Sequence, residues 1–93
     1  MKRFRWDAKK NIMLMRERTI SFEEIVQSME QEGVLDDIEH PNRDEYGHQR
    51  IFIVRHFDYV YIVPYVEENG DVFLKTIIPS RKMTKKYLKG GIS

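Results

Sequence analysis

The spacing of apolar side chains predicts a short strand and then a helix at the start of the chain. Phe4 and Trp6 alternate with charged residues in RFRW, which is the period of a strand. Asp7 is a good N-cap for a helix predicted over residues 8–17. The apolar face of this helix, which we expect to meet the core, consists of Ala8, Ile12 and Met15.

A second helix is predicted within the stretch ISFEEIVQSMEQEG. Ser21 and Glu24 form a capping box, and Ile20 is placed to pack on Ile25 as a hydrophobic staple. Gly33 marks the expected end of this helix. Its buried stripe, spaced i, i+3, i+4 and i+7, consists of Phe22, Ile25, Val26 and Met29.

After Gly33 the apolar period changes to that of strands. The segments predict, in order, a strand in VLDDIE, a loop in HPNRDEYGH and an internal strand in QRIFIVRHF, which is apolar on both faces. Asn69-Gly70 predicts a type I′ turn in a hairpin that runs from YVYIVPYVEE to DVFLKTIIP. Pro64 predicts an edge position or a bulge in that hairpin. The tail RKMTKKYLK predicts a short, basic helix.

The two-residue turn also predicts the register of the hairpin and its two faces. The expected pairs are Glu67 with Val72, Tyr65 with Leu74, Val63 with Thr76 and Tyr61 with Ile78. One face, expected to be open, carries Tyr61, Tyr65, Glu67 and Thr76. The other face, expected to take the helices, carries Ile62, Val66, Phe73 and Ile77. Lys75 departs from this division, and a bulge at Pro64 would shift it.

Together these elements predict an α+β fold. We expect a small antiparallel sheet of about four to five strands packed against two N-terminal helices, with the short basic helix at the C-terminus. The chain of 93 residues suits one domain spanning 1–93, and an apolar content of 41% with 12% aromatic residues is typical of a folded globule. The sequence has no apolar run near 18 residues and no apolar segment of a secretory signal in MKRFRWDAKKN.

Charge is segregated along the chain although the net charge is only +1. Residues 1–18 carry seven basic and two acidic residues, and residues 19–45 carry nine acidic residues and one arginine. Residues 75–93 carry six basic residues and no acid. This pattern predicts a bipolar surface, unless the basic ends fold against the acidic middle and cancel it.

The residue types exclude several classes of site. The absence of cysteine excludes disulfides, thiolate nucleophiles and cysteine zinc sites, and it is compatible with a cytoplasmic location. His40, His48 and His56 recur at eight-residue intervals, which is not a metal-ligand spacing, so we interpret them as three unrelated histidines. No phosphate loop, dinucleotide fingerprint or nucleophile elbow is present. We therefore expect neither a cofactor nor a metal.

The remaining chemistry favours a phosphodiester. Arginine and lysine neutralise phosphates and stabilise charge that develops at phosphorus. Tyrosine stacks on splayed bases, and RNA supplies its own nucleophile in the 2′-hydroxyl group. Two plainer interpretations stay open, since tyrosines commonly fill sheets and a basic helix also increases solubility.

Four motifs occur in the order FRWDAKKN, SFEE, RIFIV and IIPSRKMTKK. This order and spacing resemble the BrnT toxins, which belong to the RelE-like superfamily of type II toxin–antitoxin systems, over about residues 4–88. The resemblance implies a RelE-like fold and a cytoplasmic ribonuclease of a prokaryote that inhibits translation and growth, with RNA bound alone or on the ribosome. It also implies a cognate antitoxin with a ribbon-helix-helix part, operator DNA bound only through that antitoxin, and no membrane partner.

The resemblance carries over to individual positions. Arg50 matches the family's strand arginine, Glu67 matches the acid after the long apolar strand, and Arg81 matches the arginine of the terminal motif. Trp6 and Asp7 match the opening motif.

Three places depart from the family's pattern. Residues 16–19 read Arg-Glu-Arg-Thr where the family often has Lys-His-Gly. Pro79-Ser80 stands in place of Ser-Ala, and Thr76 stands where an arginine is common.

The predicted mechanism is metal-independent attack of the RNA 2′-hydroxyl on the adjacent phosphate. Arg81 and Arg50 would stabilise the phosphate, Glu67 is a candidate base, and Tyr65 or Tyr87 would position a nucleobase or donate a proton. The predicted RNA-binding side chains are Lys75, Lys82, Lys85, Lys86 and Lys89.

Two other classes of function remain as alternatives. The first is a non-catalytic protein-interaction module or co-repressor subunit that keeps the fold. The second, a repressor that binds DNA directly, is disfavoured because we find no helix-turn-helix spacing and the acidic second helix would be repelled by a duplex.

Overall fold

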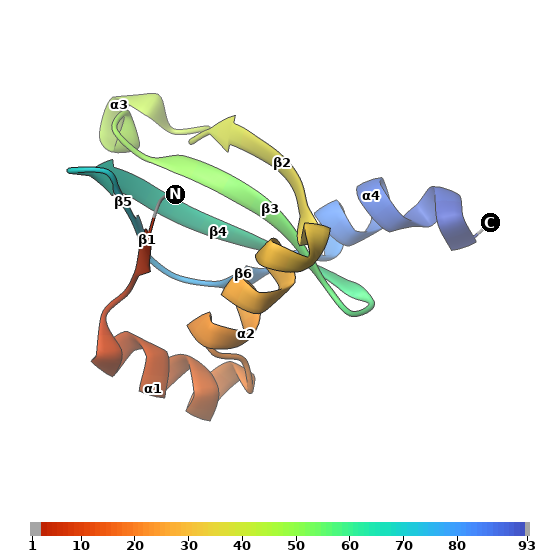
Figure 1. Cartoon of the computed structure of the whole chain (residues 1–93). Coiled ribbons are helices and arrows are strands. Elements are labelled where there is room, and N and C mark those ends of the chain that lie inside the picture. Colours follow the sequence, from red (N-terminus) through yellow and green to blue (C-terminus); the bar gives the residue numbers. More distant parts are fainter. Residues whose placement is uncertain (1–2, 93) are drawn as a thin grey trace.

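A twisted sheet with packed apolar side chains on both faces organises the chain (Figure 1). The computed structural model describes residues 3–92, and side chains as far as residue 88. Its elements are β1 (Arg3–Arg5), α1 (Ala8–Arg18), α2 (Phe22–Ser28), the π-helical turn η1 (Met29–Gly33), β2 (Val34–Glu39), α3 (Arg43–Tyr46), β3 (Arg50–His56), β4 (Tyr59–Glu68), β5 (Asp71–Leu74), β6 (Ile78–Pro79) and α4 (Arg81–Ile92). No helix within residues 3–92 is long and apolar enough to cross a membrane.

The predicted α+β class is confirmed, but the sheet is mixed and has six strands. The strand order is β1-β5-β4-β3-β2, and β6 pairs with β4 beyond the end of β5. Four of the five pairings are antiparallel, whereas β1 runs parallel to β5. The expectation of an antiparallel sheet of four to five strands was therefore wrong at its edge. The β4–β5 hairpin leaves one edge of β5 unpaired, and β1 fills that edge.

Helix α1 presents a different face to the core from the predicted one. Asn11 and Leu14 are buried, whereas Ile12 and Met15 are 54% and 48% exposed. Asn11 tolerates burial because both polar atoms of its side chain are hydrogen-bonded. Nδ2 donates to Glu23 Oε1 at 2.7 Å, and Oδ1 accepts from the Phe22 backbone N–H at 2.7 Å. A polar residue in the core shifted the helix away from the orientation that hydropathy alone predicts.

The predicted beginning of α2 is confirmed, and the helical segment ends at Gly33 as expected, although the left-handed residue at this end is Glu32. The capping box of Ser21 and Glu24 is present with both of its hydrogen bonds. The helix continues as the wider turn η1, in which Glu32 has the left-handed φ of 67°. Gly33 has a different role, since a Cβ there would lie 2.4 Å from Ser28 O and 2.8 Å from Arg55 O. Gly33 therefore lets η1 approach β3 closely.

The hairpin follows the predicted register near its turn and then slips. Asn69 and Gly70 both have positive φ, as a type I′ turn requires. The predicted pairs Glu67 with Val72 and Tyr65 with Leu74 are both present. Farther on, Ile78 pairs with Ile62 instead of Tyr61, a shift of one residue. The Lys75 N–H donates to Pro64 O at 2.8 Å within this irregular segment, so the N–H that proline lacks falls where regular pairing is already interrupted.

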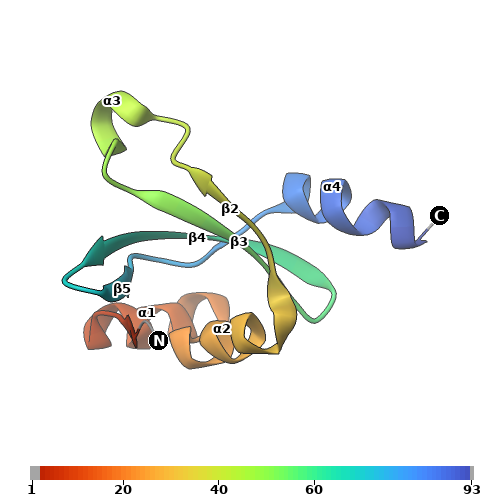
Figure 2. The same cartoon turned by 45° about the horizontal axis from the view of Figure 1, so that its top comes forward.

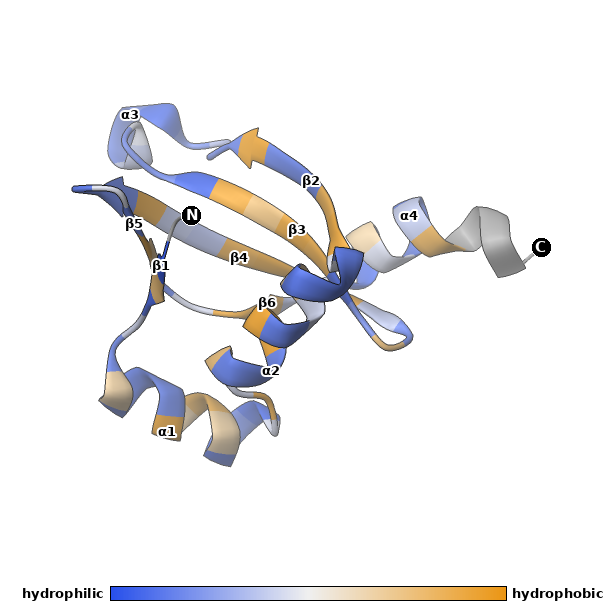
Figure 3. Cartoon of the chain, in the orientation of Figure 1, coloured by the Kyte–Doolittle hydropathy of each residue, from blue (hydrophilic) through white to orange (hydrophobic). Residues whose placement is uncertain are grey.

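Both faces of the sheet are covered, so the expectation of an open face carrying Tyr61 and Tyr65 was wrong, whereas Ile77 lies beneath α1 and α2 and Ile62 beneath α4. Tyr61, Val63 and Tyr65 pack with the first apolar cluster, beneath α1 and α2. Ile62 packs with the second cluster, beneath α4. Figure 2 shows α1 and α2 together on one side of the sheet while α4 leaves from one end, and Figure 3 shows the apolar colour concentrated along β3 and β4. Tyrosine rings supply apolar area in this core, and only their hydroxyl groups need a polar partner.

The two sides of α1 should differ sharply in their contribution to stability. Leu14→Ala should lower the free energy of unfolding by about 2–5 kcal/mol because it opens a cavity under a side chain that is 2% exposed. Ile12→Ala on the same helix should change it by less than about 0.5 kcal/mol. Urea denaturation of both variants measures the difference, and equal losses would contradict the observed orientation of α1.

Candidate functional site

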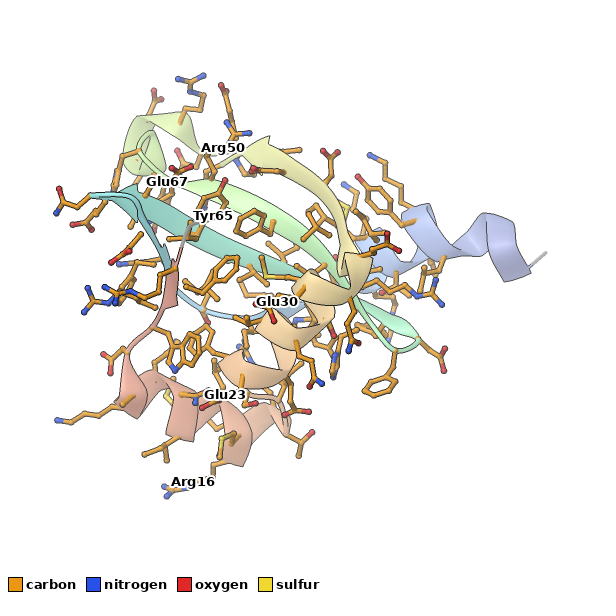
Figure 4. The ribbon with its side chains drawn as sticks, viewed as in Figure 1. Arg16, Glu23, Glu30, Arg50, Tyr65 and Glu67 are labelled. Carbon is orange, nitrogen blue, oxygen red and sulfur yellow. The ribbon has the colours of Figure 1, made fainter. Side chains whose placement is uncertain are left out.

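The five predicted catalytic residues divide into two groups on opposite faces of the sheet. Arg50 and Tyr65 are paired neighbours on β3 and β4, and Figure 4 shows Glu67 at the same end. Arg81 and Tyr87 belong to α4, whose first turn is bonded to Val60 at the other end of β4. Tyr65 packs in the cluster beneath α1 and α2, and Tyr87 packs on the other face of the sheet, so the two groups do not form one site.

The first group is organised by a carboxylate that sequence analysis missed. The Tyr65 hydroxyl donates to Asp37 Oδ1 at 2.7 Å and lies 2.9 Å from Oδ2. Arg50 donates through Nε to Asp37 Oδ1 at 3.1 Å, and through a terminal nitrogen to the Asp37 carbonyl at 2.9 Å. Asp37 stands opposite Phe52 in the β2–β3 register, so aligning VLDDIE with RIFIV would have been the signal for it.

The pKa values of both proton donors in this cluster, Tyr65 and Arg50, are raised. Burial and then the hydrogen bond to Asp37 raise the pKa of Tyr65 to about 12. The hydrogen bond to Asp37 also raises the pKa of Arg50. The Tyr65 ring stacks on Phe52 with centroids 3.9 Å apart, which holds the phenol in place. A phenol with this pKa is a weak proton donor at neutral pH, so the cluster is better suited to joining β2, β3 and β4 than to acid catalysis.

Glu67 lies on the same face as Tyr65, two residues along β4, and its side chain is exposed. It stands opposite Val72 on β5. Two carboxylates, Asp37 and Glu67, therefore lie at the end of the sheet that holds Arg50, and they reduce its attraction for a polyanion.

The second group stands on a helix that is fixed at its first turn. The Met83 N–H donates to Ser80 Oγ at 3.1 Å, and Thr84 Oγ1 accepts from the Val60 N–H at 2.9 Å while it donates to Ser80 O. The apolar side of α4 then packs on the sheet through Met83, Tyr87 and Leu88.

The opposite side of α4 is basic and exposed. It carries Arg81, Lys82, Lys85 and Lys86. Within residues 3–88 these four side chains have no ion-pair partner. The side chain of Lys89, also predicted to bind RNA, lies outside the described part of the chain.

Tyr87 adds a polar group to this face of the sheet. Its hydroxyl donates to Asp36 Oδ2 at 3.2 Å, and burial followed by this hydrogen bond raises its pKa. Lys86 Nζ lies 5.5 Å from the centre of the Tyr87 ring. Lys75 Nζ lies 5.3 Å from the Phe73 ring, which points away from the face of its buried neighbours Val72 and Leu74. Lys75 therefore shares the α4 side of the sheet.

A third group of polar side chains lines a groove near the β3–β4 turn, and no residue spacing in the sequence predicted it. Its volume is 580 Å³, and it lies between α2–η1 and the turn. His56 Nδ1 is 2.6 Å from Ser28 Oγ, and its Nε2 is 3.7 Å from Glu24 Oε2. His40 instead packs on Tyr46, 4.6 Å between ring centres. Among the described residues no group of three metal-binding side chains converges.

Comparisons with protein-family models, curated proteins and solved structures gave no match for this chain. The geometry of its own side chains is therefore the basis for the proposals below.

The raised pKa of Tyr65 makes a prediction about alkaline stability. A group whose pKa is higher in the folded state stabilises the fold fully below its unfolded pKa of about 10. That contribution is lost as pH rises from about 10 through the folded pKa of about 12. Unfolding free energies measured between pH 9 and 12 should therefore fall more steeply for the parent protein than for Tyr65→Phe. Parallel curves would show that Tyr65 titrates normally.

Proposed function

We propose that this protein is the toxin of a type II toxin–antitoxin system, and that it acts in the cytoplasm as a metal-independent ribonuclease. The observation that carries the proposal is the basic side of α4, where four exposed cations have no ion-pair partner within residues 3–88. Uncompensated cations on one side of a helix are suited to successive phosphates of a single strand. Lys75 adds a separate cation on the α4 face of the sheet, beside Phe73 of β5.

The chemical step in this proposal uses α4 and β2. Lys86, whose Nζ lies 5.5 Å from the centre of the Tyr87 ring, neutralises the reacting phosphate, and Arg81 holds a neighbouring phosphate of the strand. The RNA 2′-hydroxyl attacks phosphorus, and its proton passes to the Asp36 carboxylate. The bond to the 5′-oxygen breaks, and that oxygen takes a proton from water. Asp36, which the Tyr87 hydroxyl holds in place through its hydrogen bond, then gives its proton to the hydroxide so formed. The products are a 2′,3′-cyclic phosphate and a 5′-hydroxyl end.

The residues of the first group take a structural part in this proposal. Arg50 and Tyr65 hold β2 through Asp37, which keeps neighbouring Asp36 within reach of Tyr87. Glu67, the base predicted from the sequence, lies on the opposite face of the sheet from the α4 contacts, so Asp36 takes the role of base.

The antitoxin partner remains part of the proposal. A segment with acidic side chains would compete with RNA for the basic side of α4, and a ribbon-helix-helix part would bring the complex to operator DNA. The second candidate function is a non-catalytic interaction module or co-repressor subunit. The exposed apolar residues of α1, which are Ile12, Met13 and Met15, favour that candidate because they mark a surface for another protein.

Expression of the protein alone tests the proposed activity. Induction in a bacterial host should arrest growth, and RNA from the culture should carry new 2′,3′-cyclic phosphate ends. Arg81→Ala should reduce cleavage by roughly 10–100-fold, since it removes a phosphate contact and a hydrogen bond to a charged group contributes about 1.5–3 kcal/mol. Arg43→Ala removes an exposed arginine on α3 that already pairs with Glu39, and it serves as the matched control. Full toxicity of Arg81→Ala at equal protein level would reject the assignment.

RNA binding is tested separately by its dependence on salt. Replacing Lys82, Lys85 and Lys86 by Gln should weaken binding of a fluorescent single-stranded RNA, measured by anisotropy. The slope of log affinity against log salt should decrease by about 2, since each phosphate contact to a single strand contributes about 0.7. An unchanged slope in the triple variant would place the RNA elsewhere.

A further inference from the structure

The groove near the β3–β4 turn has features that the proposed ribonuclease does not use. Its volume of 580 Å³ is within the range of binding sites. The His56 ring packs on Tyr61, a residue of the face beneath α1 and α2, so the groove opens away from α4. The residues that line it are Glu24, Gln27, Ser28, Gln31, Glu32, Gly33, Arg55, His56 and Phe57.

One wall of the groove is acidic and polar. Glu24 uses Oε1 for its capping box with Ser21, while Oε2 is directed at His56, and the side chain is 48% exposed. Glu32 is a second carboxylate of this wall, and Gln27 and Gln31 stand one helical turn apart beside it. The groove therefore offers two carboxylates and two amides to a ligand.

The other wall carries an aromatic ring in an unusual position. Phe57 is 79% exposed, and it has a φ of 57° at the first position of the two-residue turn between His56 and Tyr59. Glycine is favoured at such a position, and a bulky side chain with positive φ is rare. The Phe57 and His56 rings form a T-shaped pair with centroids 4.6 Å apart, and most of the Phe57 side chain is open to solvent. A strained backbone with an exposed ring is a cost to the fold that a ligand contact would explain.

We infer that this groove binds an arginine side chain presented by a protein partner. A guanidinium group is planar, stacks on an aromatic ring and takes carboxylates in two parallel hydrogen bonds. Phe57 supplies the ring, Glu32 and Glu24 supply the carboxylates, and the glutamine amides supply further acceptors.

The charges around the groove favour a cation over a phosphate. Arg55 is the basic side chain among the lining residues, and its Nε is already bonded to Phe57 O at 3.0 Å. The carboxylates of Glu24 and Glu32 outnumber that one guanidinium. A nucleic-acid strand would bring its phosphates against Glu24 and Glu32, so a nucleobase is the less favoured occupant.

Titration with a minimal probe tests this inference without RNA or a cognate partner. N-acetyl-arginine methylamide, followed by amide chemical shifts, should saturate resonances of His56, Phe57 and Gln31 in the millimolar range. The citrulline analogue has nearly the same shape without the charge, and it should leave these resonances in place. Equal shifts from both probes would overturn the inference, as would stronger shifts at the same residues from cytidine monophosphate.

Two variants separate recognition from folding. Phe57→Gly accommodates the positive φ without a Cβ, so its thermal midpoint should be unchanged or raised, while arginine affinity falls at least fivefold. Glu32→Gln should weaken arginine binding, and Glu45→Gln on α3 should not. Undiminished arginine binding by folded Phe57→Gly would reject the groove as the site. None of these results depends on whether the protein cleaves RNA, so failure here and failure of the proposed function are distinguishable.

Discussion

Burial of both faces of β4 is the constraint on which the rest of the structure depends. One face puts Val63 and Tyr65 beneath α1 and α2, and the other puts Val60 and Ile62 beneath the start of α4. A sheet covered on one side only would leave one of these sets in water, at a cost of about 25 cal/mol per Å² of apolar surface. Helix α4 is therefore part of the core as well as a carrier of positive charge. Packing of its apolar side on the sheet fixes the direction in which its basic side faces.

This double coverage also determines which polar groups meet. Side chains alternate along each strand, so Asp36 and Asp37, adjacent in the sequence, reach opposite faces and take different tyrosines as partners. Asp37 joins Tyr65 and Arg50 on one face, and Asp36 joins Tyr87 on the other. A bulge in β2 next to these residues sets their orientation relative to β3. The two aspartates thus connect the central strands with an edge strand and with the C-terminal helix.

Features of the fold that depend on neighbouring residues could be predicted from the sequence. The capping box at Ser21 and the turn at Asn69-Gly70 are local, and both have the predicted geometry. Features that depend on distant partners could not. The burial of Asn11 requires Glu23 and the Phe22 amide, which hydropathy does not register, and the slip at Ile78 requires the irregular segment before it. For the candidate site, the residue types were visible, but their division between two faces was not, because it follows from strand register and from the choice of helix for each face.

The pairing of β1 with β5 has a consequence for the order in which the protein folds. Arg3 and its partner Asp71 lie 68 positions apart in the chain. Helices α1 and α2 leave the ribosome before the central strands that they cover, so Phe22 and Ile25 remain exposed while most of the chain is synthesised. The two antiparallel hairpins that share β4 have short loops, so closing them costs little conformational entropy. The first strand, in contrast, pairs with β5 only after residue 73 has emerged. The N-terminal third is therefore the last part of the molecule to become native and the part most in need of protection from proteases and aggregation during synthesis.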